Sequence, residues 1–284
     1  MASVYDRLLG ARQALTGAGI APEEAAIDAE VLARHVLGWD RAALVSRWRD
    51  QAPDNLDSLL DPLLARRAAR EPVAYITGHR EFWGLDFEVT PAVLIPRPET
   101  ELIIEEALTL AADVRGPHRI VDVGTGCGCI AIALAHELTS ATVIGTDLSA
   151  AALEVARKNA ARLGVSDRVT FLEADLLDGV QSAANLIVSN PPYVPAAGAA
   201  SLQPEVGRYE PATALFGGND DGLGTVRRLF AVACQYLAGD GRLVVEFGFG
   251  QEARLADAAR EAGWQVCRVR EDLQGIPRVA VLRR

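Results

Sequence analysis

Residues 1–72 carry apolar side chains at intervals of three and four, which is the period of amphipathic helices. Ser3 precedes the first apolar stripe as a candidate N-cap, and Asp40 precedes a third. Pro22 opens a second helix that Gly38 closes. The residues expected on the buried faces include Val4, Leu8, Ala11, Leu15, Ile27, Val31, Leu32, Leu44, Val45, Leu56, Leu59, Leu60, Leu63 and Leu64. We therefore expect residues 1–72 to form a small helical bundle.

The pattern changes over residues 73–98. Two short runs that contain aromatic residues, 80–83 and 86–89, flank Gly84 and predict a β-hairpin. Three prolines follow within ten residues, so we expect a stiff connector rather than a flexible linker. Residues 99–284 are then expected to form a second domain.

In this second domain, short apolar runs alternate with helical stretches. Strands are predicted over residues 119–123, 142–146, 168–172, 185–189, 242–247, 264–270 and 278–282. The last two are joined by a short loop and are expected to pair antiparallel. A helix is predicted over residues 225–238, and residues 194–224 read as one long loop. The pattern predicts an α/β fold with a doubly wound, mostly parallel, Rossmann-like sheet of about seven strands and an antiparallel edge.

Composition narrows the possible partners. The formal net charge is −10, from 28 Lys and Arg against 38 Asp and Glu. This balance counts against a nucleic acid bound mainly through its phosphates. We find no 18-residue apolar run and no N-terminal apolar signal region, so neither a membrane span nor a secretion signal is predicted. The four cysteines lack the spacing of a metal site, and we expect reduced thiols, no metal, and a monomeric cytoplasmic protein.

A glycine-rich turn follows the first predicted strand of the second domain. It reads Gly124-Thr125-Gly126-Cys127-Gly128, and Asp147 ends the next strand, 23 residues after Gly124. This is the nucleoside-binding layout of doubly wound folds, in which the acid accepts hydrogen bonds from ribose hydroxyls. The dinucleotide fingerprint requires glycine at position 129, where this chain has Cys129, so S-adenosylmethionine fits better.

Three further residues surround this predicted cofactor site. Asp175 follows the third predicted strand and is placed for the adenine amino group, with Leu176 placed for the adenine face. Asp122 comes just before the glycine turn. Its carboxylate is expected to bind either a loop amide or the cofactor, and the sequence leaves both readings open.

The segment Ser189-Asn190-Pro191-Pro192-Tyr193 follows the fourth predicted strand. Two prolines cannot continue a strand, so they hold a rigid turn with unpaired carbonyls. Asn190 adds a side-chain carbonyl, and Tyr193 adds an aromatic face that suits a flat substrate near a sulfonium. Two acceptors on the N–H bonds of a planar amine would orient its nitrogen toward an electrophile. An ordinary surface loop is the alternative interpretation.

With these pieces placed, the sequence resembles the HemK/PrmC-type release-factor glutamine methyltransferases over nearly its whole length. The likeness is carried by residues 72–78, by Ile95-Pro96-Arg97-Pro98-Glu99-Thr100-Glu101, by residues 122–128 and 189–193, and by residues 208–218. Two positions depart from the family pattern. Cys127 stands where the family commonly has Ser, and Leu176 stands where some members have an aromatic residue.

The resemblance implies methylation of the glutamine in the Gly-Gly-Gln motif of bacterial peptide chain release factors. By position, Asn190 would accept one amide N–H through its side chain, Pro191 the other through its carbonyl, and Tyr193 would pack on the amide. Pro192 completes the implied substrate site. The family would bind S-adenosylmethionine along Gly124, Thr125, Gly126, Asp147 and Leu176, and the helical N-terminal domain would grip the release factor.

Two other functions remain open from the residues alone. One is methylation of an exocyclic amine on a nucleic-acid base, which would require a basic face and a pocket for a flipped base. The other is a non-catalytic module that binds the cofactor and a partner. The intact segment from Asn190 to Tyr193 argues against the second.

Overall fold

The computed structural model describes residues 2–112, 118–181 and 183–284. Its chain divides into two units. The first contains the residues up to Gly78 together with Gln203–Tyr209, and the second contains His79–Leu202 and Glu210–Arg284. Within the described ranges, no helix is long and apolar enough to cross a membrane.

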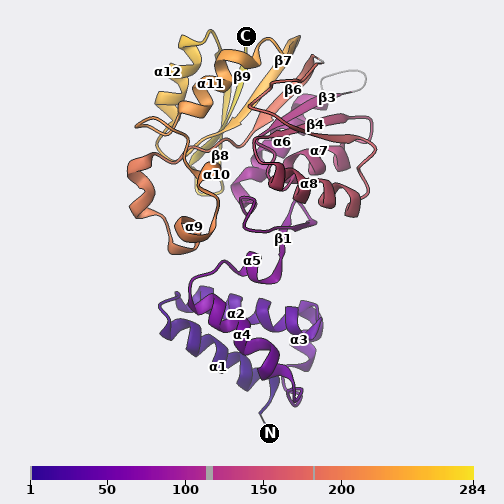
Figure 1. The fold of residues 1–284 in the computed structure, drawn as a ribbon, viewed down its shortest axis with the longest axis vertical. Helices are drawn as coiled ribbons and strands as arrows, with labels where there is room; N and C mark the ends of the chain where they lie inside the picture. Colours follow the sequence, from indigo (N-terminus) through magenta and orange to yellow (C-terminus); the bar gives the residue numbers. More distant parts are fainter. Residues whose placement is uncertain (1, 113–117, 182) are drawn as a thin grey trace. The chain divides into compact units, whose positions relative to one another are not determined.

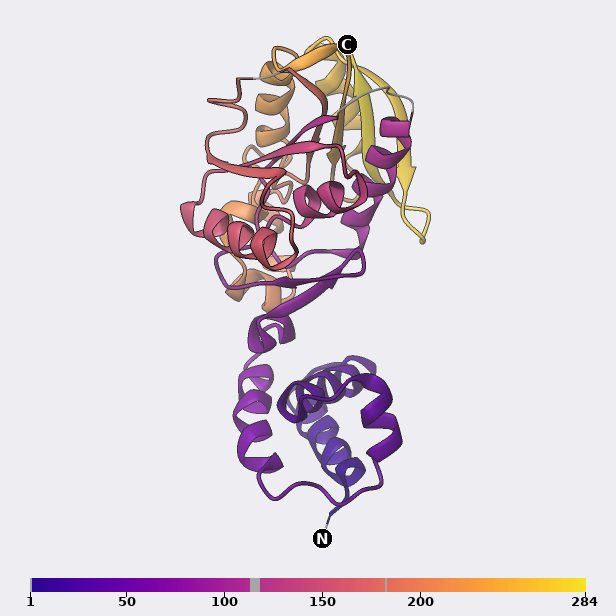
Figure 2. The same ribbon diagram turned by 90° about the vertical axis from the view of Figure 1, so that its right-hand side faces the viewer.

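The first unit is helical (Figures 1 and 2). Its helices are α1 (Val4–Gly17), α2 (Pro22–Leu37), α3 (Arg41–Arg47), α4 (Leu56–Ala68), α5 (Val73–Thr77) and α9 (Pro204–Tyr209). The predicted helix ends are confirmed. Ser3 forms a capping box with Asp6, Asp40 accepts a hydrogen bond from the amide of Ala43 at 2.6 Å, and Gly38 ends α2 with a φ of 65°.

The buried face of this unit differs from the predicted one. Ile27 is 63% exposed, and Val45 and Leu59 are exposed as well, so the prediction for these three residues was wrong. On α2, Asp28 rather than Ile27 faces the interior of the unit. Its carboxylate is paired there, because the buried guanidinium of Arg67 lies 2.6 Å away. The interior is formed by Leu15, Ile20, Leu32, Leu56 and Leu60 together with small alanines.

The second unit begins with the predicted hairpin, β1 (His79–Phe82) and β2 (Leu85–Glu88), which is confirmed. Its two turn residues, Trp83 and Gly84, both have positive φ, as a tight two-residue hairpin turn requires. The fully buried Asn159 holds the hairpin in place, since its side chain exchanges two hydrogen bonds with the backbone of Glu88.

Seven strands of the described residues form one sheet, in the order β5-β4-β3-β6-β7-β9-β8 (Figure 1). They are β3 (Arg119–Val123), β4 (Thr142–Asp147), β5 (Val169–Glu173), β6 (Ala184–Ser189), β7 (Leu237–Glu246), β8 (Gln265–Glu271) and β9 (Pro277–Arg283). The pairs from β5 to β7 are parallel, whereas β9 runs antiparallel between β7 and β8. The predicted doubly wound, mostly parallel sheet is confirmed.

Helices cover the sheet on both faces. The helices are α6 (Glu101–Ala112) after the short turn η1 (Pro98–Thr100), α7 (Cys129–Glu137), α8 (Ala150–Arg162), α11 (Gly224–Ala233) and α12 (Glu252–Glu261). On one face, Val121, Ile187 and Val245 pack with α11 and α12. Side chains alternate along a strand, so Ile120, Val188 and Val244 bury the opposite face, where α6, α7 and α8 adjoin one another.

Three segments differ from the predicted elements. Residues 194–224 are not one open loop but contain η2 (Ala196–Ser201), α9 and α10 (Ala212–Leu215). Strand β7 begins at Leu237, inside the range predicted for a helix, because Leu237 pairs with Ala184 of β6. Helix α5 was also not predicted, since five residues are too few for a periodic pattern.

Candidate active site

Two loops meet where the neighbouring strands β3 and β6 end. Val123 and Ser189, the last residues of these strands, stand opposite each other in the parallel register. The glycine turn follows one and the Asn-Pro-Pro-Tyr segment follows the other. A Cβ on Gly124 would lie 4.0 Å from the carbonyl oxygen of Asn190, so the two predicted motifs are in contact. This is the edge at which doubly wound sheets bind ligands.

The glycine turn is held by strand β4. The amides of Gly124 and Thr125 donate to the carbonyl of Thr146 at 2.8 and 2.9 Å, and the amide of Gly126 donates to the Asp147 carboxylate at 2.9 Å. The φ angles of Gly124 and Gly126 are 74° and 57°, a region that favours glycine. Among the described residues, a Cβ on Gly126 would meet no atom within 4 Å beyond its chain neighbours, so the turn presents open backbone to a ligand.

The other predicted turn residues lie beneath this open surface. A Cβ on Gly128 would come within 2.9 Å of Ile132 and 3.2 Å of Ala156, so Gly128 packs against helices rather than a ligand. The side chain of Cys127 is buried, and its carbonyl accepts a hydrogen bond from Asn159 at 2.9 Å. These two residues shape the turn from below.

Asp122 is buried under the turn. One carboxylate oxygen accepts hydrogen bonds from the hydroxyl of Thr125 at 2.6 Å and the amide of Ala131 at 3.2 Å. Its other oxygen has no hydrogen-bond partner within the part of the chain that the structure describes. Burial raises the pKa of Asp122 to about 7. Asp122 thus binds the loop itself, one of the two roles left open by the sequence.

Asp147 ends β4 beside the turn, and Asp175 and Leu176 follow β5. The Asp147 oxygens each accept one amide, from Gly126 and from Ser149, which fixes the carboxylate beside the turn. Leu176 has a positive φ of 55°, and its carbonyl accepts a hydrogen bond from Thr146 at 2.7 Å. The Asp175 carboxylate pairs with Arg228 at 2.5 Å on the surface.

Asn190 is oriented by Thr100, a residue of η1. The side-chain nitrogen of Asn190 donates to the Thr100 hydroxyl at 3.0 Å, and that hydroxyl donates to Glu246 at 2.8 Å. The carbonyl of Asn190 is therefore turned away from Thr100. Neither this oxygen nor the carbonyl of the adjacent Pro191 accepts a hydrogen bond from any described residue.

Tyr193 is held in place by hydrogen bonds at both its side-chain hydroxyl and its backbone carbonyl. Its hydroxyl donates to the second oxygen of Glu246 at 3.3 Å, and Gln251 donates to its carbonyl at 2.9 Å. Gly217 and Gly222 press on the segment so closely that a Cβ would lie 2.4 Å from the Pro192 carbonyl and 2.2 Å from the Tyr193 carbonyl. The long segment after the motif thus supports it from behind.

Glu246 is a site residue that reading the sequence missed. It ends β7, is 1% exposed, and burial raises its pKa to about 7. Burial, with the neighbouring Glu246, also raises the pKa of Tyr193. The sequence does contain a signal for Glu246: it is a single acidic residue at the end of an apolar strand. That strand, β7, runs parallel to β6, which leads into the Asn-Pro-Pro-Tyr motif.

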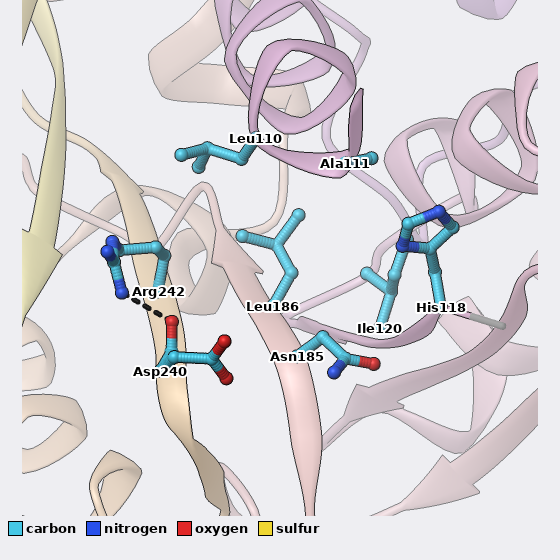
Figure 3. A pocket seen from close by; sticks show the side chains of 8 residues that line it. All are labelled: Leu110, Ala111, His118, Ile120, Asn185, Leu186, Asp240 and Arg242. Atoms are coloured by element: carbon cyan, nitrogen blue, oxygen red, sulfur yellow. Dashed lines mark hydrogen bonds between the residues drawn. The ribbon is translucent and has the colours of Figure 1, made fainter. Parts of the chain in front are cut away.

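A cavity of about 150 Å³ lies at the opposite edge of the sheet, where β3 and β6 begin (Figure 3). It is lined by Leu110, Ala111, His118, Ile120, Asn185, Leu186, Asp240 and Arg242. None of the predicted site residues lines it. We place the candidate site at the carboxyl ends of the strands, because the oriented polar groups converge there.

Comparisons with known proteins identify the family of the chain. Residues 7–78 match the PrmC N-terminal domain, and residues 100–203 match the methyltransferase small domain. The chain is 44% identical over 268 residues to a release factor glutamine methyltransferase of Geobacter sulfurreducens, covering 90% of this chain and 89% of that one. It is 41% identical over 279 residues to the Deinococcus radiodurans enzyme of the same name, covering 98% of each chain.

Among solved structures, a methyltransferase from Pyrococcus furiosus superposes with a TM-score of 0.51 at 19% identity, covering 77% of this chain and 95% of that one. That likeness shows the methyltransferase fold of the sheet. The sequence relatives go further, because they cover both units at about 40% identity. The chain therefore belongs to the release factor glutamine methyltransferase family.

Proposed function

We propose that the protein transfers a methyl group from S-adenosylmethionine to the side-chain nitrogen of the glutamine in the Gly-Gly-Gln motif of peptide chain release factors. Family membership supports the reaction. The single observation in the site that carries it is the orientation of Asn190. Its amide nitrogen is held by Thr100, and neither its carbonyl oxygen nor the carbonyl of the adjacent Pro191 has a hydrogen-bond partner among the described residues.

Asn190 and Pro191 supply what a carboxamide substrate needs. A primary amide nitrogen has two N–H bonds and a lone pair delocalised into its carbonyl. If the Asn190 side-chain oxygen and the Pro191 carbonyl accept the two N–H bonds, the nitrogen is fixed in one position and gains electron density. The nitrogen would form a bond to the methyl carbon as the bond from that carbon to the sulfonium sulfur breaks, with S-adenosylhomocysteine as the leaving group, and one N–H proton would be lost to water. Tyr193, anchored through Glu246, offers its ring face to the flat amide.

The glycine turn and its neighbours suit S-adenosylmethionine, which supplies the electrophilic methyl group when bound. The open backbone at Gly124 and Gly126 leaves room for a ligand, and Asp147 has a lone pair left on each oxygen for ribose hydroxyls. Asp175 and Leu176 would face adenine. The other residues expected at the cofactor site have supporting roles. Thr125, Cys127 and Gly128 hold the shape of the glycine turn, and Asn190 lies between the cofactor site and the substrate site.

The helical unit would recognise the protein substrate. Its surface carries Tyr5 and Trp48, whose rings meet edge to face at 5.5 Å and are each more than 40% exposed. Arg49 lies over the Trp48 ring. Aromatic and Arg side chains of this kind are enriched in protein interfaces. We further propose a monomeric, cytoplasmic enzyme in which residues 1–72 bind the release factor and residues 73–98 connect them to the methyltransferase domain.

The test is methyl transfer from labelled S-adenosylmethionine to a purified release factor. The matched control is the same factor with the glutamine of its Gly-Gly-Gln motif replaced. Label on the first and none on the second would establish substrate and site together. Label on neither factor, with the cofactor still bound, would refute the proposal and direct attention to base amines of nucleic acids or to a binding module.

A further inference from the structure

A chain of hydrogen bonds beneath Asn190 joins three segments that are distant in sequence. Asn190 donates to Thr100, 90 residues earlier, and Thr100 donates to Glu246, 146 residues later. Thr100 is 2% exposed and Glu246 is 1% exposed. The Thr100–Glu246 hydrogen bond is therefore shielded from water, in an environment where hydrogen bonds are stronger and an unpaired polar group destabilises the fold.

Which groups donate and which accept in these hydrogen bonds follows from the chemistry of Glu246. Above its pKa of about 7, Glu246 is ionised and its carboxylate only accepts hydrogen bonds, so the single hydroxyl hydrogen of Thr100 is then committed to Glu246. The Thr100 oxygen can then only accept, and only the NH2 end of the Asn190 amide can donate to it. The carbonyl end of Asn190 must consequently face away from Thr100.

Without Glu246 this preference would be lost. A free hydroxyl can donate to the carbonyl end of an amide as readily as it can accept from the NH2 end. Asn190 could then turn over and present N–H groups where the substrate also presents N–H groups. Tyr193 occupies the second Glu246 oxygen at 3.3 Å, so the same carboxylate braces both side chains of the motif.

We infer that Glu246 is a positioning residue for methyl transfer: through Thr100 it determines which end of the Asn190 amide faces the substrate. This inference rests on the proposed function, since it concerns the acceptor for a substrate N–H. In this role Glu246 acts on Asn190 indirectly, through the hydroxyl group of Thr100.

The experiment removes that hydroxyl and restores it. Thr100→Val keeps the shape of the side chain and deletes the hydroxyl, whereas Thr100→Ser keeps the hydroxyl. We expect Thr100→Val to lower kcat for release-factor methylation by about 10-fold to 100-fold, less than loss of a direct contact. We expect Thr100→Ser to retain most of the turnover. Both should bind S-adenosylmethionine within a few-fold of wild type, which also reports that they are folded.

A double-mutant cycle separates positioning from general support of the core. If Thr100 acts through Asn190, Thr100→Val should cost little further turnover when Asn190 is already Ala. Additive losses in the double variant would overturn the inference, as would normal kcat in Thr100→Val. Glu246→Gln provides an independent check, because Thr100 and Tyr193 donate to different oxygens of Glu246 and glutamine replaces one of these acceptors with an NH2 donor, and we expect a loss as large as that of Thr100→Val.

The wild-type enzyme keeps the two proposals apart. Wild-type turnover on the release factor combined with an unaffected Thr100→Val variant overturns the positioning role and leaves the proposed function intact. A wild-type protein that binds cofactor but does not methylate the release factor overturns the proposed function and, with it, this role of Glu246.

Discussion

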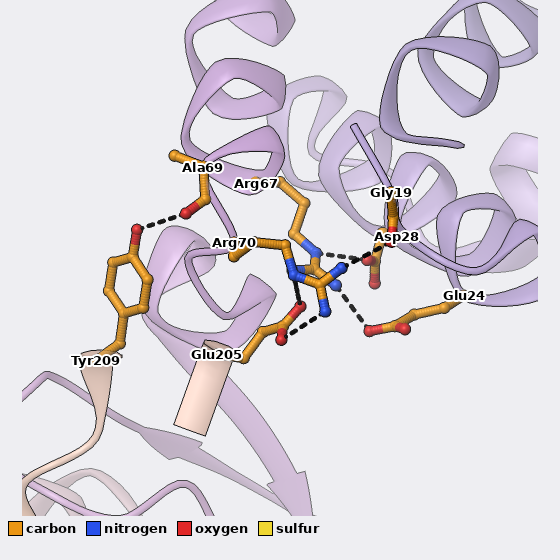
Figure 4. A network of polar contacts seen from close by, with 8 residues as sticks. All are labelled: Gly19, Glu24, Asp28, Arg67, Ala69, Arg70, Glu205 and Tyr209. Carbon is orange, nitrogen blue, oxygen red and sulfur yellow. Dashed lines mark hydrogen bonds and ion pairs between the residues drawn. The ribbon is translucent and has the colours of Figure 1, made fainter. Parts of the chain in front are cut away.

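Arg67 and Glu205 are 138 residues apart in sequence, yet a guanidinium nitrogen of Arg67 lies 2.7 Å from a Glu205 carboxylate oxygen (Figure 4). The same guanidinium reaches Asp28 at 2.6 Å and Glu24 at 2.7 Å, and it is almost fully buried. Burial opposes ionisation of Glu205, but hydrogen bonds from Arg67 and Arg70 outweigh it and lower the pKa of Glu205. The helix that follows the Asn-Pro-Pro-Tyr motif is thereby tied into the helical unit.

Replacing Arg67 should loosen the helical unit. Arg67→Met leaves the buried Asp28 without its cation and leaves Glu205 with Arg70 alone, so we expect the free energy of unfolding to fall by about 3–5 kcal/mol. Hydrogen exchange should become faster over residues 203–209. Arg66→Met is the matched control, because Arg66 pairs with Glu71 at the surface, where such pairs contribute at most about 1 kcal/mol. Equal effects of the two substitutions would contradict the account of this network.

Asn190→Ala should separate binding from turnover. We expect S-adenosylmethionine affinity to stay within a few-fold of wild type while kcat falls about 10²–10³-fold, because an oriented acceptor for the substrate nitrogen is lost. Asn185→Ala, at the other end of the same strand β6, should leave turnover near normal. Steady-state kinetics and calorimetric cofactor titration of the three proteins provide the comparison. Near-normal kcat in Asn190→Ala would disprove the mechanism.

Gly126→Ala tests where the cofactor lies. Gly126 and Gly164 both have positive φ, and within the ranges that the structure describes a Cβ on either would meet no atom within 4 Å beyond its chain neighbours. Each alanine substitution should therefore lower the free energy of unfolding by about 1 kcal/mol, through backbone strain alone. Only Gly126→Ala should weaken S-adenosylmethionine binding, by about 10-fold or more, since its methyl group would enter the space assigned to the ligand. Equal cofactor affinity in the two variants would contradict that assignment.

Asp122 predicts a specific dependence of stability on pH. Its pKa of about 7 in the folded protein exceeds the usual value of 3.8, so the folded state binds the proton more tightly and loses stability as pH rises from about 4 to 7. The full shift corresponds to about 4 kcal/mol. Asp122→Asn does not titrate and should gain stability relative to wild type between pH 5 and pH 8. Urea unfolding without cofactor measures this, and parallel pH curves for the two proteins would contradict it.

Local sequence determined much of the fold and of the site. Helix ends at Ser3, Gly38 and Asp40 depend on interactions within a few residues, and the structure has them as predicted. The hairpin also forms as predicted, but its turn is Trp83-Gly84, one residue earlier than the predicted strands 80–83 and 86–89 imply. The two motifs were recognised for the same reason, because each lies in one continuous stretch. Their contact followed from the parallel sheet, which brings the carboxyl ends of its strands to one edge.

Only the tertiary structure decided which polar groups act together. The pairing of Arg67 with Glu205 and the chain from Asn190 through Thr100 to Glu246 join residues 90 to 146 positions apart. No local pattern encodes such pairs, and helical periodicity even placed Ile27 inside, where the structure buries Asp28. Each buried charge or amide is tolerated because a distant partner satisfies it, and that partner becomes visible only when the chain is folded.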